Sequence, residues 1–157
     1  MAVKPVPEGY HTLTPYLSLD DAAGAIEFYK QAFGAKEQMR MDAPGGKIGH
    51  AQLQIGDSLV MLSDAFPGSS VRPPRELGAT NASIFMYVED VDAVVKKAVD
   101  AGATVTTEVE DQFWGDRFGT VTDPFGHVWS IATHVEDVPP EEMAERAKQA
   151  MAQMASS

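Results

Sequence analysis

The sequence predicts an α+β protein made of two tandem copies of one unit, in which a strand and a helix precede three further strands. One observation is an internal repeat, because the acids expected to begin the helices, Asp21 and Asp90, and the FGA and AGA motifs recur at an offset of roughly 68 to 69 residues. The other is a change after each helix from an apolar period of about 3.6 residues to a period of 2. Duplication of a βαβββ unit explains both.

The first copy begins with a short strand at 13–19 and continues into a helix. Asp20 or Asp21 can cap this helix at its N-terminus, and Gly34 lies where a glycine commonly ends one. The alternating stretch GKIGHAQLQIGDSLVMLSD then predicts two strands, with Gly56-Asp57 as the two-residue hairpin turn between them.

The second copy repeats this order, with a strand at 84–88, an N-cap at Asp90 and a helix stop at Gly102. Period-2 patterns then predict strands at 103–109, 117–123 and 127–134. The Asp-Pro-Phe-Gly sequence that ends at Gly126 is explained as turn chemistry, because proline fixes one dihedral angle and glycine permits a positive φ.

The domain organisation follows from the residue ranges of the expected strands and helices. Residues 1–138 are expected to form one domain, with unit one at about 10–65 and unit two at about 80–137, followed by a helical tail at 139–157. The connection at 64–81 is rich in Pro and Gly and is either a linker or a functional lid. The tail helix packs on its own domain or on a partner, because its apolar face must be buried somewhere; that face comprises Met143, Ala147, Ala150, Met151 and Met154.

Composition narrows the class of protein. The chain has 157 residues, of which 44% are hydrophobic and 22% charged, as in globular proteins, and its formal charge is -11. Such a charge repels nucleic acid and anionic membranes, so neither is expected as a partner. Cysteine is absent, which leaves only His, Asp and Glu as strong metal ligands. There is no apolar run of membrane-spanning length and no secretory signal pattern, so we expect a cytoplasmic protein.

Four segments carry a family resemblance: AIEFYKQAFGA, HAQLQIGDSLVMLSD, VEDVDAVVKKAVDAGA and DQFWGDRFGTVTDPFGHVW. With their surroundings, at roughly 13–137, they resemble the vicinal oxygen chelate superfamily, its glyoxalase/bleomycin-resistance branch and, within that, PhnB-like proteins. The resemblance implies two curved half-barrels, with helices on the convex side and a ligand cavity on the concave side. It also implies that, in the metal enzymes of the family, the first and last strands of each unit supply His or Glu ligands.

This sequence departs from that ligand pattern. The four corresponding positions are occupied by Thr14, Met61, Ser83 and Ser130. Hydroxyl groups and a thioether do not offset the dehydration of a divalent ion, and neighbours one residue away supply no ligand set either. We therefore predict no metal and no other cofactor.

The cavity can be described from the same alternation. If Met61 points inward, then Gln52 lies opposite it, and His50 lies inward opposite Ser63. Trp114 and Arg117 are expected at the cavity mouth, where they either bind a planar, cationic or carboxylate ligand or form a brace with Asp116. The predicted ligand-binding residues are Tyr16, His50, Gln52, Met61, Phe85, Tyr87, Trp114, Arg117 and Ser130.

A neutral, aromatic lining is typical of a pocket for an organic ligand. The sequence thus favours a metal-free homodimer that sequesters or carries a small organic molecule, rather than an enzyme. One alternative is a glyoxalase-like lyase or isomerase, or a dioxygenase, that uses a divalent metal. Another is a metal-free enzyme with His50 as its general base, although His50 can equally be a lining residue without catalytic duty. A last one is an interaction module based on the methionine-rich tail.

Overall fold

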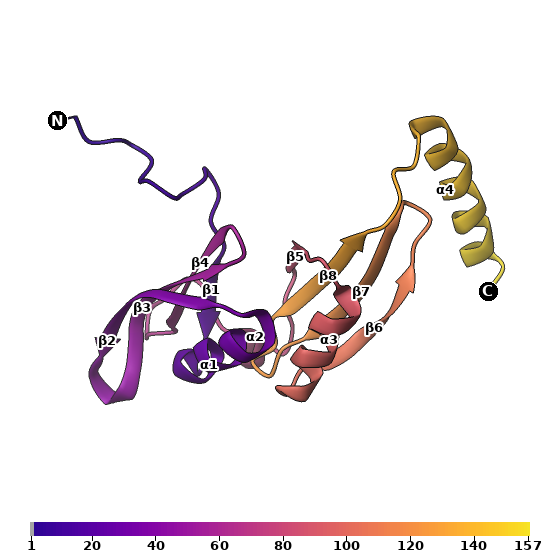
Figure 1. Ribbon diagram of the computed structural model, residues 1–157. Coiled ribbons are helices and arrows are strands. Elements are labelled where there is room, and N and C mark those ends of the chain that lie inside the picture. The colour runs from indigo at the N-terminus through magenta and orange to yellow at the C-terminus, as the bar shows by residue number, and fades with distance from the viewer. Residues whose placement is uncertain (1) are drawn as a thin grey trace.

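The computed structural model describes residues 2–157, which form two four-stranded mixed sheets, each with one long helix (Figure 1). The first sheet has the strand order β1-β4-β3-β2, in which β1 is parallel to β4 and the other pairs are antiparallel. Its unit comprises β1 (Tyr16–Leu19), α1 (Ala22–Phe33), β2 (Lys36–Ala43), a 3-10 turn (Pro44–Gly46), β3 (Lys47–Ile55) and β4 (Ser58–Asp64).

The second sheet repeats this topology in the order β5-β8-β7-β6. Its unit comprises β5 (Ser83–Tyr87), α3 (Val91–Asp100), β6 (Thr104–Asp111), β7 (Asp116–Thr122) and β8 (Val128–His134). The two sheets are open rather than closed into a barrel, so the predicted α+β fold with tandem βαβββ units is confirmed.

The local signals for the helices are also confirmed. The carboxylate of Asp21 accepts a hydrogen bond from the Gly24 N–H, and that of Asp90 accepts one from the Ala93 N–H. Gly34 ends α1 in the left-handed region at φ 66°. The first strand begins later than expected, at Tyr16, because Pro15 has no N–H to donate to β4.

The two units join through their helices and one buried carboxylate. Helix α1 packs against α3, and both cover a shared core. Asp123, in the turn between β7 and β8, accepts hydrogen bonds from the Tyr29 hydroxyl at 2.6 Å and from Trp129 Nε1 at 2.9 Å. Burial, and then the Asp123 carboxylate, raise the pKa of Tyr29 well above its ordinary value, so this phenol remains a donor.

The connection between the units, expected to be a linker or a lid, contains the short helix α2 (Pro74–Leu77). Arg75 donates to the Asp20 carboxylate of the first unit at 2.8 Å and to the Pro124 carbonyl of the second at 3.1 Å. Its guanidinium also lies 5.4 Å from the centre of the Phe125 ring. The connection therefore bridges the two units.

The C-terminal helix α4 (Pro140–Ala155) extends away from both units (Figure 1). None of its residues is buried, so packing on its own domain, one of the two expectations for this helix, is not observed. Its base is held by Arg146, which pairs with Glu136 at 2.7 Å and donates to the Phe113 carbonyl at 3.3 Å. The apolar face of α4 is exposed only at its C-terminal end, at Met151 and Met154, whereas Met143, Ala147 and Ala150 are half-buried.

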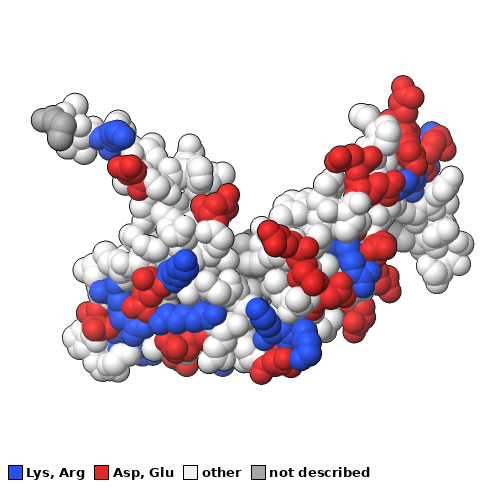
Figure 2. All heavy atoms as spheres, viewed as in Figure 1, with Lys and Arg blue, Asp and Glu red and all other residues white. Residues whose placement is uncertain are grey.

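Charge is unevenly distributed over the surface. In the view of Figure 2, acidic side chains dominate the second unit and α4, whereas basic side chains form a band on the first unit and a smaller group over α3. No helix within residues 2–157 combines the length and the apolar character needed to cross a bilayer.

Candidate functional site

Each sheet has one face that packs on the helices and one that turns away from them, which we call its free face. In the first sheet, Ala51, Leu53 and Leu62 are fully buried on the helix side. Cross-strand register places the intervening residues on the free face, since directly paired residues share a face. One row across the free face comprises Tyr16, Met61, Gln52 and Met39.

His50 lies in the neighbouring row of this free face, paired with Met41. Its Nδ1 lies 2.9 Å from the Tyr16 hydroxyl, and its Nε2 lies 3.3 Å from Gln52 Nε2. The structure thus brings Tyr16, His50, Gln52 and Met61 together, with both imidazole nitrogens engaged by uncharged groups.

Aromatic side chains dominate the free face of the second sheet. The ring of Phe85 lies 5.1 Å from that of Tyr87 and 5.7 Å from that of Phe118, while Trp114 lies 5.9 Å from Phe118, all between ring centres. Ser130 pairs with Phe85 and lies in the same row. We call Phe85, Tyr87, Trp114 and Phe118 the aromatic cluster.

A buried carboxylate anchors this cluster. Asp116 is only 2% exposed and accepts hydrogen bonds from the Tyr87 hydroxyl and from Trp114 Nε1, each at 2.9 Å. His134 Nδ1 lies 2.8 Å from the same carboxylate, and His134 Nε2 lies 2.7 Å from Asp137. Burial alone would raise the pKa of Asp116, but the hydrogen bonds from His134, Tyr87 and Trp114 outweigh it and hold the pKa below its ordinary value.

Arg117 does not join this arrangement. It follows Asp116 on β7, so its side chain points to the helix side, where it binds Asp92 at 2.7 Å and Asp111 at 3.2 Å. The expected brace between Arg117 and Asp116 is therefore not formed. Trp114 is anchored instead through its own indole N–H to Asp116.

Protonation of His134 is expected to strengthen the support of the cluster. Asp137 and then Asp116 raise the pKa of His134, so the stabilisation it gives is complete below the ordinary histidine pKa and is lost as pH rises through the raised value. An NMR titration of the ring C–H signals should show this histidine titrating above about 6.5. Asp137→Asn should move its midpoint down, and an unchanged midpoint would contradict the contact.

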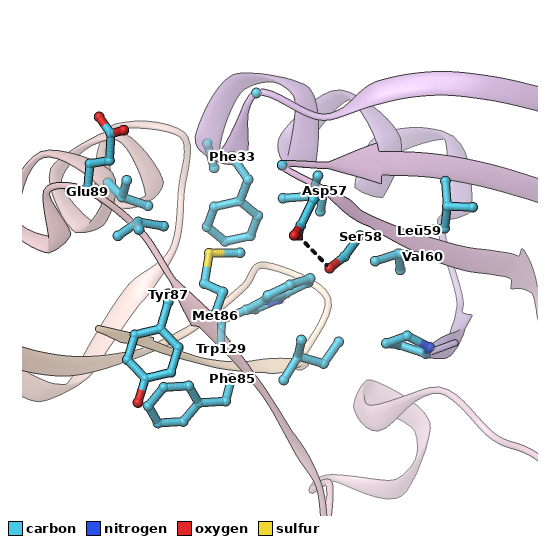
Figure 3. Close-up of a pocket in the computed structure, with 18 of the residues that line it drawn as sticks. Phe33, Asp57, Ser58, Leu59, Val60, Phe85, Met86, Tyr87, Glu89 and Trp129 are labelled. Atoms are coloured by element: carbon cyan, nitrogen blue, oxygen red, sulfur yellow. Dashed lines mark hydrogen bonds between the residues drawn. The ribbon is translucent and has the colours of Figure 1, made fainter. Parts of the chain in front are cut away.

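A large cavity lies elsewhere, between the two units (Figure 3). Its volume is ≈ 1170 Å³, and it opens between the β3–β4 hairpin and β5. Its apolar side chains include Phe33 at the end of α1, together with Val60, Ile84, Met86 and Trp129 from the helix side of the two sheets. Of the nine predicted ligand-binding residues, only Phe85 and Tyr87 border it, and Figure 3 shows their rings on the other side of β5 from Met86.

Two residues of this second free face, Phe118 and His134, were not predicted from the sequence. Ser130 pairs with Thr120, so extending the alternation back along β7 from Thr120 would have placed Phe118 and Asp116 on the free face. Asp116 on β7 is paired directly with His134 on β8. The register of these two strands would therefore have indicated that the two side chains are in contact.

The side chains at the positions that correspond to the metal ligands of the superfamily's enzymes do not fit a divalent metal ion. Met61 and Ser130 lie in the rows described above, and their pairing partners there are Tyr16, Gln52, Phe85 and Thr120. None of these offers a carboxylate or an imidazole. Across residues 2–157, no three His, Asp or Glu side chains are grouped so that they could hold a metal ion.

Comparison with known proteins agrees with the fold. A family model described as "Glyoxalase/Bleomycin resistance protein/Dioxygenase superfamily" matches residues 11–131. The chain belongs to this superfamily. One relative, protein Mb0911c of Mycobacterium bovis, is 50% identical over 129 residues, which cover 80% of this chain and 85% of that protein.

Two solved structures show the same architecture. TioX from Micromonospora sp. ML1 is 26% identical, with a TM-score of 0.63 over 80% of this chain and 100% of the other. The PhnB protein of Bacillus cereus is 16% identical, with a TM-score of 0.63 over 78% of this chain and 99% of the other, which is a likeness of fold alone. Because the superfamily includes binding proteins and enzymes, function must be argued from the site.

Proposed function

We propose that this member of the superfamily is a metal-free, cytoplasmic protein that binds a small organic molecule and sequesters or carries it. The observation that supports this proposal is the chemistry of two rows on the free faces, Tyr16–Met61–Gln52 and Phe85–Ser130, where aromatic and neutral side chains are paired and no metal-ligand set is present among the described residues. Apolar and aromatic walls with a few oriented polar groups are what a pocket for an organic ligand requires.

The same proposal includes a homodimer. Ligand pockets bury most of their ligand, yet Met41 on the first free face is 56% exposed and Tyr87 on the second is 63% exposed. A second copy would enclose such a ligand, and the exposed methionines of the first free face and of α4 favour a contact between copies; they are Met39, Met41, Met151 and Met154.

Ligand binding is tested by a thermal-shift screen of planar and cationic organic compounds on the purified full chain. We expect at least one compound to raise the melting temperature, and Phe85→Ala or Gln52→Ala to reduce that shift. Phe66→Ala, which removes an exposed aromatic ring from the connection, should leave the shift unchanged. A screen without a hit, or hits equally reduced by all three variants, would contradict the proposal.

The metal-free part is tested by elemental analysis after dialysis against zinc, nickel, manganese and iron(II), followed by desalting. We expect far less than one metal ion per chain, because the donor set is inadequate. Near-stoichiometric metal would refute this part of the proposal.

Sedimentation of the same sample should show twice the chain mass, whereas a monomer would contradict the homodimer.

A further inference from the structure

We infer that the aromatic cluster on the second sheet is a site for an organic cation, such as an aryl or alkyl ammonium group. This inference rests on the proposed function and adds the chemical class of its ligand. The faces of aromatic rings are electronegative and attract a cation placed within about 6 Å of the ring centre. Neighbouring ring centres in the cluster are 5.1 to 5.9 Å apart, so one ammonium group can contact more than one ring.

The rings are accessible to a ligand. Tyr87 is 63% exposed and Phe85 is 48% exposed, and both project from the same side of the edge strand β5 (Figure 3). Trp114 and Phe118 are half-buried and form the base of the cluster. A ligand can therefore approach from the open side without displacing the core.

Two carboxylates make this face electronegative. Asp116 lies behind the rings and accepts hydrogen bonds from the Tyr87 hydroxyl and the Trp114 indole. A ring whose donor is bonded to an anion is polarised toward higher electron density, which strengthens its attraction for a cation. Glu110 pairs with Phe118 across β6 and β7, and so adds a second negative charge on the same face.

The nearby positive groups do not cancel this charge. Arg117 points to the other face and is bound by Asp92 and Asp111. His134 stands between Asp116 and Asp137, so any charge on its ring is matched by two carboxylates. A second copy of this chain, with the same charge of -11, complements the cluster less well than an organic cation does.

The test compares (4-hydroxyphenyl)trimethylammonium with its neutral isostere 4-tert-butylphenol, titrated into full-length protein at constant ionic strength. Binding is followed by the NMR signal of the Trp114 indole N–H. We expect the cation to bind about fivefold to tenfold more tightly than the isostere, and Tyr87→Leu to weaken the cation at least about threefold. Phe66→Leu serves as the control outside the cluster.

Two variants that each remove one negative charge measure the electrostatic contribution to cation binding without altering a buried residue. Glu110→Gln should weaken the cation about twofold to threefold and leave the neutral probe unchanged. Asp111→Asn removes the same charge from the opposite face of the same strand and should change neither.

Each of four results would overturn the inference. Equal binding of both probes, with Glu110→Gln silent, would leave an organic-ligand site without charge selectivity, and the proposed function would stand. Binding of neither probe, while the thermal-shift screen yields a hit, would likewise reject the cation alone; failure of both experiments would reject the proposed function as well. If Tyr87→Leu changed the sedimentation of the protein but not its affinity for the cation, the cluster would be a contact between two copies.

Discussion

Replacing Asp123 with alanine is expected to destabilise the protein by roughly 3–5 kcal/mol, since a buried network loses its only acceptor. The carboxylate is 4% exposed and accepts from the Tyr29 hydroxyl, from Trp129 Nε1 and from the backbone N–H groups of Phe125 and His127. Alanine would leave these buried donors without a partner. Urea unfolding followed by circular dichroism would measure the loss.

The contact with Tyr29 crosses between the units, so it can be examined separately. Tyr29→Phe should cost about 1–2 kcal/mol, and less than that when Asp123 is already alanine, because the two variants remove the same hydrogen bond. Asp42→Ala, which removes an exposed carboxylate, should stay within about 0.5 kcal/mol of the parent protein. Strictly additive losses would show that the two residues do not support each other.

The fold could be predicted from the sequence because its signals are local. N-caps, a helix-ending glycine and a two-residue hairpin turn each depend on a few neighbouring residues, and the duplication supplied the N-cap and the glycine twice. The turn at Gly56-Asp57 also fixed the register of β3 and β4, and the predicted pairing of Gln52 with Met61 is observed.

The site was predictable only where such a register was available. The strand containing Arg117 was expected to begin at that residue, whereas β7 begins at Asp116. Asp116 and Arg117 are consecutive residues of β7, so their side chains point to opposite faces of the sheet. Asp116 lies on the free face and Arg117 lies on the helix side. Trp114 precedes the strand, and its position depends on the long-range contact with Asp116.

The direction of α4 could not be predicted for a different reason. Its apolar stripe fits a helix that packs on its own domain as well as one that packs on another molecule. What orients the helix is contact at its base, where Arg146 binds Glu136 and the carbonyl of Phe113. Those contacts join residues that no local pattern relates.

Gly115→Ala is expected to destabilise the protein by roughly 2–4 kcal/mol and to weaken ligand binding as well. Gly115 has φ 99°, a conformation that alanine adopts only with strain, and a Cβ there would collide with the carbonyl oxygen of Glu136. Because Gly115 stands between Trp114 and Asp116, relief of that collision must move the loop that carries both, and with it the aromatic cluster.

Hydrogen exchange can localise this effect. The Gly115 carbonyl accepts from the N–H groups of Val135 and Glu136 at 2.9 and 3.0 Å, and both amides should lose protection in the alanine variant. Gly45→Ala is the matched control: its φ is 79°, but a Cβ there meets nothing within 4 Å, so only the strain of about 1 kcal/mol applies. If both variants were equally stable and kept those amides protected, the close approach at Gly115 would not be what positions Trp114 and the base of α4.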